Sequence, residues 1–205
     1  METAIARRAG AYEWDQWHNR LENRRGSISD WERRVAYDLI CPSPGERAVD
    51  LGCGTGDWTR VLANWGLETT GYDYSRIALD FARQVDTGGR VTYRDWDIDA
   101  EGAPAALSPG SVDIVTCRLS IEFLNRERLL TDVQRWLKPG RGRFYALIRV
   151  APEGWTEGPD KFRRGLTRRQ IQHLGTYWSV REEFDEYETF QDGYGRLGLL
   201  LRAPV

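Results

Sequence analysis

The feature that most constrains this chain is a run of alternating glycines directly after a short apolar segment. It reads VDLGCGTGDW over residues 49–58, with Gly52, Gly54 and Gly56 following the acidic residue Asp50. Glycine adopts backbone angles that other residues avoid and lets a ligand approach the main chain closely. A helix that begins after such a turn presents unpaired N–H groups to that ligand. The pattern predicts a strand, a ligand-binding turn and a helix, with close packing of strand on helix as the alternative interpretation.

Dinucleotide-binding folds place glycines at the same point, so the turn alone does not identify a ligand. Their pattern is GxGxxG, whereas this chain has GxGxG and carries Asp57 at the third position of that fingerprint. A carboxylate there opposes a pyrophosphate but tolerates a ligand with an ammonium or sulfonium group. The charge therefore argues against a dinucleotide. Asp57 also suits a simple role as an acidic residue in the first turn of the helix.

Segments with helical periodicity alternate with short apolar segments, which predicts an α/β fold with a mainly parallel sheet. Ser29, followed by Glu32 in the pattern of a capping box, and then Ser75 and Thr167 stand where helix N-caps are expected. The expected helices cover residues 12–21, 29–40, 57–65, 75–84, 125–137 and 167–174. The expected strands cover residues 47–51, 68–72, 90–94, 112–116, 143–150, 179–188 and 196–202, and residues 99–109 form a loop or a short helix.

Two further carboxylates follow the second and third expected strands. Asp73 lies in GYDYS (71–75) and Asp97 in DWDI (95–98). The carboxyl ends of parallel strands open on one crevice, where ligands of doubly wound sheets bind. A carboxylate there can accept hydrogen bonds from ribose hydroxyls. The sequence therefore predicts a nucleoside-bearing ligand in this crevice.

These segments, with VDIVTC (112–117) and RWLKPGRG (135–142), resemble the successive motifs of class I S-adenosylmethionine-dependent methyltransferases. The match runs from about Glu46 to Val150 in the order and spacing of that family. The resemblance implies a Rossmann-like, seven-stranded mixed sheet of order 3-2-1-4-5-7-6 with the last strand antiparallel. It also implies helices on both faces of the sheet and an N-terminal helical lid.

The resemblance further implies a cofactor site for S-adenosylmethionine, with S-adenosylhomocysteine as the product. Asp50 and the glycine turn, namely Gly52, Cys53, Gly54 and Gly56, would hold the methionine part. Asp73 would bind the ribose and Asp97 the adenine amino group, with Tyr74 and Ile98 on the faces of the ring. Arg118, after the fourth strand, would line the reactive end of the cofactor.

The acceptor side carries weaker signals. Related small-molecule O-methyltransferases often have a histidine after the fourth strand, but RLSIEFL (118–124) places Glu122 near that position. Glu122 is a candidate general base or anionic partner for an ammonium substrate, and its alternative is a solvated residue before the next helix. His18 is the rival base. Tyr12, Trp14 and Trp17 are candidates for the lid, where their rings could make cation–π contacts with an ammonium substrate. Together with Glu122 they favour N-methylation, and O-methylation stays open. Trp155, in the loop 151–165, is the second choice for acceptor contacts.

Length and composition indicate one domain of 205 residues with 40% hydrophobic side chains. Its expected parts are a helical lid (1–45), a cofactor-binding core (46–150) and a substrate loop with C-terminal strands (151–205). The net charge of −2 gives no general attraction to nucleic acid, and the three cysteines suit reduced thiols in the cytoplasm. No signal peptide, membrane segment or metal-ligand set is expected. The expected partner is a small-molecule acceptor, and the expected assembly is a monomer or homodimer.

Two other functions stay open. An RNA or protein methyltransferase would need a basic stripe or a tetrapeptide of the NPPY type after the fourth strand, where this chain has TCRL (116–119). A non-catalytic protein that binds S-adenosylmethionine would keep the cofactor motifs without turnover.

Overall fold

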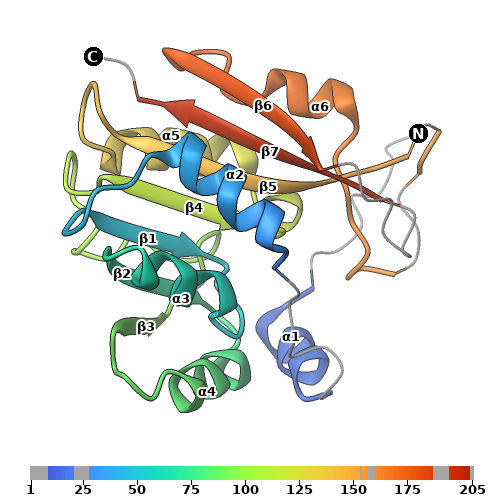
Figure 1. Cartoon of the computed structure of the whole chain (residues 1–205). Helices are drawn as coiled ribbons and strands as arrows, with labels where there is room; N and C mark the ends of the chain where they lie inside the picture. Colours follow the sequence, from blue (N-terminus) through green and yellow to red (C-terminus); the bar gives the residue numbers. More distant parts are fainter. Residues whose placement is uncertain (1–8, 21–27, 153, 157–159, 187–193, 204–205) are drawn as a thin grey trace.

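Figure 1 shows the computed structural model of the chain as a central sheet with helices on both faces. The structure describes residues 9–20, 28–152, 154–156, 160–186 and 194–203. Seven strands form the sheet in the order β3-β2-β1-β4-β5-β7-β6. β7 runs antiparallel to β5 and β6, whereas the other neighbouring strands are parallel. The expected strand order and the antiparallel last strand are confirmed.

The bounds of the elements follow the sequence pattern closely. The strands are β1 (Arg47–Leu51), β2 (Glu68–Asp73), β3 (Val91–Asp95), β4 (Ile114–Arg118), β5 (Arg143–Val150), β6 (Val180–Glu186) and β7 (Gly195–Arg202). The helices are α1 (Ala11–His18), α2 (Asp30–Ile40), α3 (Asp57–Asn64), α4 (Arg76–Val85), α5 (Arg126–Trp136), α6 (Arg168–His173) and the 3-10 helix η2 (Ile121–Phe123). Residues 99–109 contain no helix. The expected ends at residues 21 and 187–188 lie outside the described residues.

Side-chain caps determine where several helices begin. The hydroxyl of Ser75 accepts the Ala78 N–H at the start of α4, and Thr167 forms a capping box with Gln170 at the start of α6. Ser29 accepts the Glu32 N–H at the start of α2. The capping box expected there is wrong in its second half, because the Glu32 carboxylate is bound to Arg118 instead.

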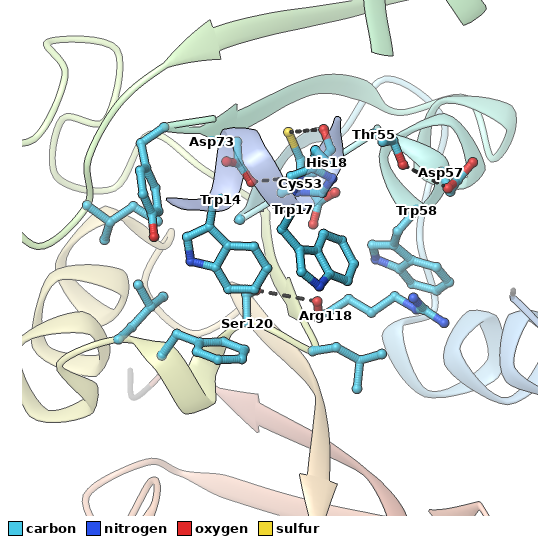
Figure 2. A pocket seen from close by; sticks show the side chains of 18 of the residues that line it. Trp14, Trp17, His18, Cys53, Thr55, Asp57, Trp58, Asp73, Arg118 and Ser120 are labelled. Carbon is cyan, nitrogen blue, oxygen red and sulfur yellow. Dashed lines mark hydrogen bonds between the residues drawn. The ribbon is translucent and has the colours of Figure 1, made fainter. Parts of the chain in front are cut away.

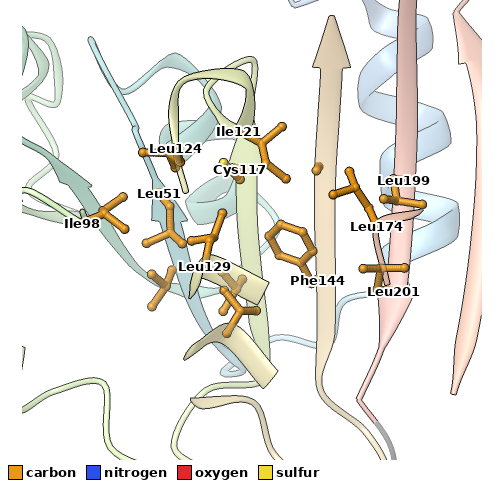
Figure 3. Packing of buried hydrophobic residues seen from close by; sticks show 14 of the residues in the cluster. Leu51, Ile98, Cys117, Ile121, Leu124, Leu129, Phe144, Leu174, Leu199 and Leu201 are labelled. Carbon is orange, nitrogen blue, oxygen red and sulfur yellow. The ribbon is translucent and has the colours of Figure 1, made fainter. Parts of the chain in front are cut away.

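Two helical layers cover the sheet. On one face α5 and α6 pack on alternate residues of the central strands, and Figure 3 shows part of this core: Leu51, Cys117, Leu129, Phe144, Leu174, Leu199 and Leu201. On the other face α2 and α3 contribute Ala36, Ile40, Trp58 and Leu62, which pack with Ala48, Ile114 and Tyr145. α4 packs through Leu79 and Ala82 near Tyr93 of β3. Burying a large apolar side chain contributes about 1.5–3 kcal/mol, so these layers hold the strand ends in place.

α1 lies apart from both layers, beside the carboxyl ends of β1 and β2 (Figure 1). It is a single helix of eight residues with an exposed Tyr12 and a buried His18. Because α2 belongs to the layer on the sheet, α1 is the part of the expected N-terminal lid that stands over the strand ends. Within the described part of the chain, no helix is both long and apolar enough to cross a membrane.

Candidate functional site

A cavity of about 240 Å³ lies at the carboxyl ends of the central strands, with α1 over it (Figure 2). It brings together most of the residues that the sequence predicted. Those that line it are Trp14, Trp17, His18, Asp50, Gly52, Cys53, Gly54, Asp73, Tyr74, Ile98 and Arg118. Residues from α1, from three strand ends and from the segment after β3 therefore share one site.

The glycine turn forms bare backbone beneath the cavity. Gly52 and Gly54 have φ of 66° and 52°, a region that favours glycine. A Cβ atom at Gly52 would lie 2.7 Å from the Ser120 Cβ, so no other side chain fits there without a shift. Gly56 also has a positive φ, 75°, but it caps α3 and is not among the lining residues.

Asp50, the last residue but one of β1, is a buried carboxylate held by two hydroxyl groups. Thr59 Oγ1 donates to Oδ2 at 2.7 Å, and Thr116 Oγ1 donates to Oδ1 at 2.8 Å. Burial raises the pKa of Asp50 to about 6, although both hydroxyls favour the ionised form. A cationic group in the cavity would lower that pKa again. No local sequence signal marked either threonine, and only the register that pairs Asp50 with Thr116 could have indicated one of them.

Asp73 ends β2 in a similar setting. Its Oδ2 accepts the Gly54 N–H at 2.9 Å, and its Oδ1 accepts the Ser75 N–H at 2.8 Å. Burial raises the pKa of this carboxyl group, and these backbone donors offset part of the rise. A carboxylate has about four acceptor positions, so Asp73 can still receive ribose hydroxyls. Bare glycine backbone between two buried carboxylates fits a cationic nucleoside cofactor.

The adenine end is only partly assembled as expected. Tyr74 and Ile98 line the cavity, as the resemblance implies for side chains on the ring faces. Asp97 is not among the lining residues, and its Oδ1 accepts the N–H groups of Asp99 and Ala100 at 3.0 and 3.2 Å. Its role toward the adenine amino group remains a prediction.

An aromatic wall, formed by Trp14, Trp17, Phe123 and Phe162, lines part of the cavity. The Trp14 ring meets Phe123 and Phe162 edge-on, with centroids 5.1 and 4.9 Å away, and it lies 5.4 Å from Trp17. The sequence predicted the two tryptophans, but no local signal marked the two phenylalanines.

Two aromatic residues predicted for the acceptor side do not line the cavity. Tyr12 is 74% exposed. Trp155 lies against Tyr194, with ring centroids 6.4 Å apart. Phe162 occupies the place in the loop after β5 that the sequence analysis had given to Trp155.

The structure contradicts one of the two sequence interpretations of Glu122. It lies in η2 as a buried residue, and its Oε1 accepts the Arg149 N–H, so the solvated alternative is wrong. Burial raises the pKa of Glu122 to about 6, with the Arg149 N–H offsetting part of the rise. It is not among the residues that line the cavity. His18, the rival base, does line it, with Cε1 3.6 Å from the position of a Cβ at Gly54.

Charged groups of both signs line the cavity. The lining carboxylates, Asp50, Asp57 and Asp73, come from β1, the start of α3 and β2. The lining guanidinium groups, Arg118 and Arg149, come from β4 and β5. Arg118 is paired with Glu32, and its charge also acts to lower the pKa of Asp50. Within the described ranges, no group of three or more His, Cys, Asp or Glu side chains could hold a metal ion.

Comparison with known proteins gives the same assignment. Residues 49–146 match the family described as "Methyltransferase domain". Residues 49–146 therefore form a methyltransferase domain. The resemblance seen in the sequence is confirmed over this part of the chain, together with the strand order expected for class I S-adenosylmethionine-dependent methyltransferases.

Among curated proteins, the ubiquinone biosynthesis O-methyltransferase of Ralstonia nicotianae is 35% identical over 122 residues, which are 58% of this chain and 48% of that protein. The biotin biosynthesis bifunctional protein BioHC of Cellvibrio japonicus is 37% identical over 125 residues, 58% of this chain and 24% of that protein. The chain thus spans about half of the first relative and a quarter of the second.

Solved structures share the fold at lower identity. Phosphoethanolamine N-methyltransferase 2 of Haemonchus contortus, in complex with S-adenosyl-L-methionine, superposes with a TM-score of 0.72 at 20% identity, covering 95% of this chain and 56% of that one. The [4+2]-cyclase SpnF superposes with a TM-score of 0.67 at 19% identity, covering 89% of this chain and 85% of that one. These similarities establish the fold of the chain. They do not identify its substrate.

Proposed function

We propose that this protein transfers the methyl group of S-adenosylmethionine to an oxygen or nitrogen atom of a small-molecule acceptor. The observation that carries the proposal is the pair of buried carboxylates, Asp50 and Asp73, on either side of the bare glycine turn in one cavity. A ligand with an ammonium and a sulfonium group offsets the cost of burying these charges, and a nucleoside ribose uses the free acceptor positions of Asp73.

The lining residues support an assignment of the cofactor site. Asp50 and the backbone of Gly52 to Gly54 would face its amino-acid part, Asp73 its ribose, and Tyr74 and Ile98 its adenine. When bound, the cofactor supplies a methyl group already activated by a good leaving group. The protein then aligns the acceptor with that methyl group and excludes water, which are the contributions this reaction needs. α1 provides the cover that excludes water.

The acceptor end favours a molecule with an apolar body. Four aromatic side chains form its wall. Glu122 lies outside the lining and offers no carboxylate to an ammonium group, and the charge of Arg118 is already paired with Glu32. The wall therefore supports an aryl or alkyl acceptor that reacts through a hydroxyl or a neutral amine. This acceptor class differs from the ammonium substrates that the sequence favoured.

His18 is the side chain that we assign as general base. Its imidazole lines the cavity between the glycine turn and the aromatic wall, with its ring centroid 4.8 Å from that of Trp17. Imidazoles exchange protons near neutral pH, which suits removal of a hydroxyl proton during transfer. His18→Gln should lower kcat by about 10²-fold or more for a hydroxyl acceptor and flatten the pH profile. An unchanged kcat and profile would remove His18 from that role.

The proposal is tested in two steps. Calorimetry with S-adenosylhomocysteine measures cofactor binding, and methyl transfer from radiolabelled S-adenosylmethionine is then assayed on matched acceptors. A phenol and a primary alkylamine on the same aryl body separate the two acceptor chemistries, with RNA and a protein mixture as further arms. We expect binding and preferential methylation of the phenol. Preference for the alkylammonium form would overturn the acceptor class, and methylation of RNA or protein alone would overturn the small-molecule function.

Cofactor binding with no turnover on any acceptor would favour the second candidate, a protein that binds the cofactor without transferring its methyl group. SpnF, described as a [4+2]-cyclase, shares the fold, so the fold alone does not decide between the two. The titratable His18 in the lining favours the enzyme, because a binding protein needs no base.

A further inference from the structure

Asp15 joins α1 to the first turn of α4. Its Oδ1 accepts the hydroxyl of Ser75 at 2.7 Å and the N–H of Ile77 at 3.3 Å. The Ser75 oxygen also accepts the Ala78 N–H at 3.2 Å, so this hydroxyl both caps α4 and donates to α1. The amides of a first helical turn have no partner within their helix. Asp15 supplies one from a different helix, and a carboxylate suits the positive end of the α4 dipole.

This junction adjoins the proposed ribose site. The Ser75 N–H donates to Asp73, and the Tyr74 hydroxyl donates to the Ala9 carbonyl just before α1, at 3.0 Å. Each residue of this segment therefore lines the cavity or contacts the helix above it. The segment consists of Asp73, Tyr74 and Ser75. Any shift of this segment when a nucleoside binds reaches α1 directly.

The residues next to Asp15 on α1 form one wall of the cavity. Trp14, Trp17 and His18 line it, and the Trp14 ring packs on Phe123 and Phe162. α1 has eight residues, and helices of this length are marginal alone. Its position over the cavity therefore depends on contacts with the rest of the protein, such as those of Asp15, and α1 is the part of the wall that can move when a ligand enters.

We propose that Asp15 is a positioning residue that couples cofactor binding to the acceptor wall. By holding α1 to the start of α4, it places Trp14, Trp17 and His18 over a nucleoside bound at Asp73, and it releases them when the cofactor exchanges. The inference rests on the proposed function, because the nucleoside at Asp73 is the methyl donor or its product.

The test measures hydrogen exchange of the α1 amides and the dissociation rate of S-adenosylhomocysteine, so it needs no acceptor. In the wild type, the bound product should slow exchange in residues 11–18 several-fold. Asp15→Ala should lose most of that slowing and release the product several-fold faster, the effect of one lost hydrogen bond. Asp15→Asn keeps an oxygen acceptor and should behave nearly as the wild type. Asp38→Ala, an exposed aspartate on α2, is the matched control and should change neither readout.

The outcomes separate the two proposals. If S-adenosylhomocysteine binds and protects the α1 amides equally in the wild type and in Asp15→Ala, the positioning role alone is overturned. The same holds if Asp15→Asn loses as much protection as Asp15→Ala. A wild-type protein that fails to bind S-adenosylhomocysteine would overturn the proposed function and this inference together. Circular dichroism of the Asp15→Ala variant checks that its sheet is still folded, so that the change is confined to α1.

Discussion

Glu32 on α2 binds the guanidinium of Arg118 at the end of β4 through two hydrogen bonds, of 2.6 and 2.9 Å. The side chains of Glu32 and Arg118 are 2% and 13% exposed, so the pair is almost fully removed from water. Leu119, the next residue, has a φ of 53°, which is rare outside glycine and strained for a branched side chain. Arg118 and Leu119 both line the cavity, so the ion pair fixes the backbone at its rim.

Breaking this pair should destabilise the protein strongly. Glu32→Gln leaves the Arg118 charge buried without its carboxylate, and such losses cost about 3–5 kcal/mol. Denaturation by urea measures the change in the free energy of unfolding. The control is Asp30→Asn, which removes the exposed pair with Arg33 on the same helix and should cost less than about 1 kcal/mol. Equal losses in the two variants would contradict a structural role for the Glu32 pair.

The buried Glu122 should make stability depend on pH. Its folded-state pKa of about 6 lies above the ordinary value of 4.5, so its contribution is fully present at low pH and is lost as the pH rises through 6. The loss between pH 4.5 and pH 8 should be about 2 kcal/mol. Glu122→Gln cannot ionise, so the difference between wild type and variant should change by that amount over this range. The exposed Glu127→Gln on α5 should show no such change.

Glu122→Gln also separates stability from catalysis. Because Glu122 does not line the cavity, the variant should bind S-adenosylhomocysteine with unchanged affinity and keep most of its turnover. A large drop in kcat with normal affinity would return Glu122 to the role of general base that the sequence suggested.

Local signals in the sequence were sufficient for most of the fold. Arg47–Leu51 and Arg143–Val150 have the expected bounds, because short apolar runs flanked by turn residues are typical of buried strands. Ser75 and Thr167 cap the helices that they were expected to cap. The glycine turn and the acidic residues at the strand ends indicated the nucleoside side of the cavity for the same reason: their spacing is local.

Local sequence signals did not predict the contacts on the acceptor side of the cavity. Phe162 and Glu32 gain their roles from contacts with residues far away in the chain, and no local period marks such contacts. The sequence left Glu122 as a candidate general base or a solvated residue before a helix, but η2 turns it into the core. Asp15 stands in a helix that was expected to carry aromatic side chains and the candidate base His18, and its partner Ser75 is 60 positions away.

Asp73 should account for much of the affinity for the cofactor. Asp73→Ala removes a charged acceptor of ribose hydroxyls and should weaken binding of S-adenosylhomocysteine by about 1.5–3 kcal/mol, measured by calorimetry. Asp95→Ala, an exposed aspartate at the end of the neighbouring strand β3, is the matched control and should leave the affinity unchanged. If the two variants bind equally well, Asp73 does not contact the ligand.

Gly56 should matter for folding rather than for ligand contact. It caps α3 with a φ of 75°, and a Cβ atom there would lie 2.4 Å from the Tyr93 hydroxyl oxygen and 2.8 Å from its ring. Gly56→Ala therefore combines an unfavourable backbone angle with overpacking and should destabilise the protein by about 2–4 kcal/mol. Gly102→Ala is the control, because no atom lies within 4 Å of a Cβ there and its φ is not in the left-handed region. If both variants unfold at the same urea concentration, the glycine at position 56 is not required by the turn, and contact with the cofactor becomes its better explanation.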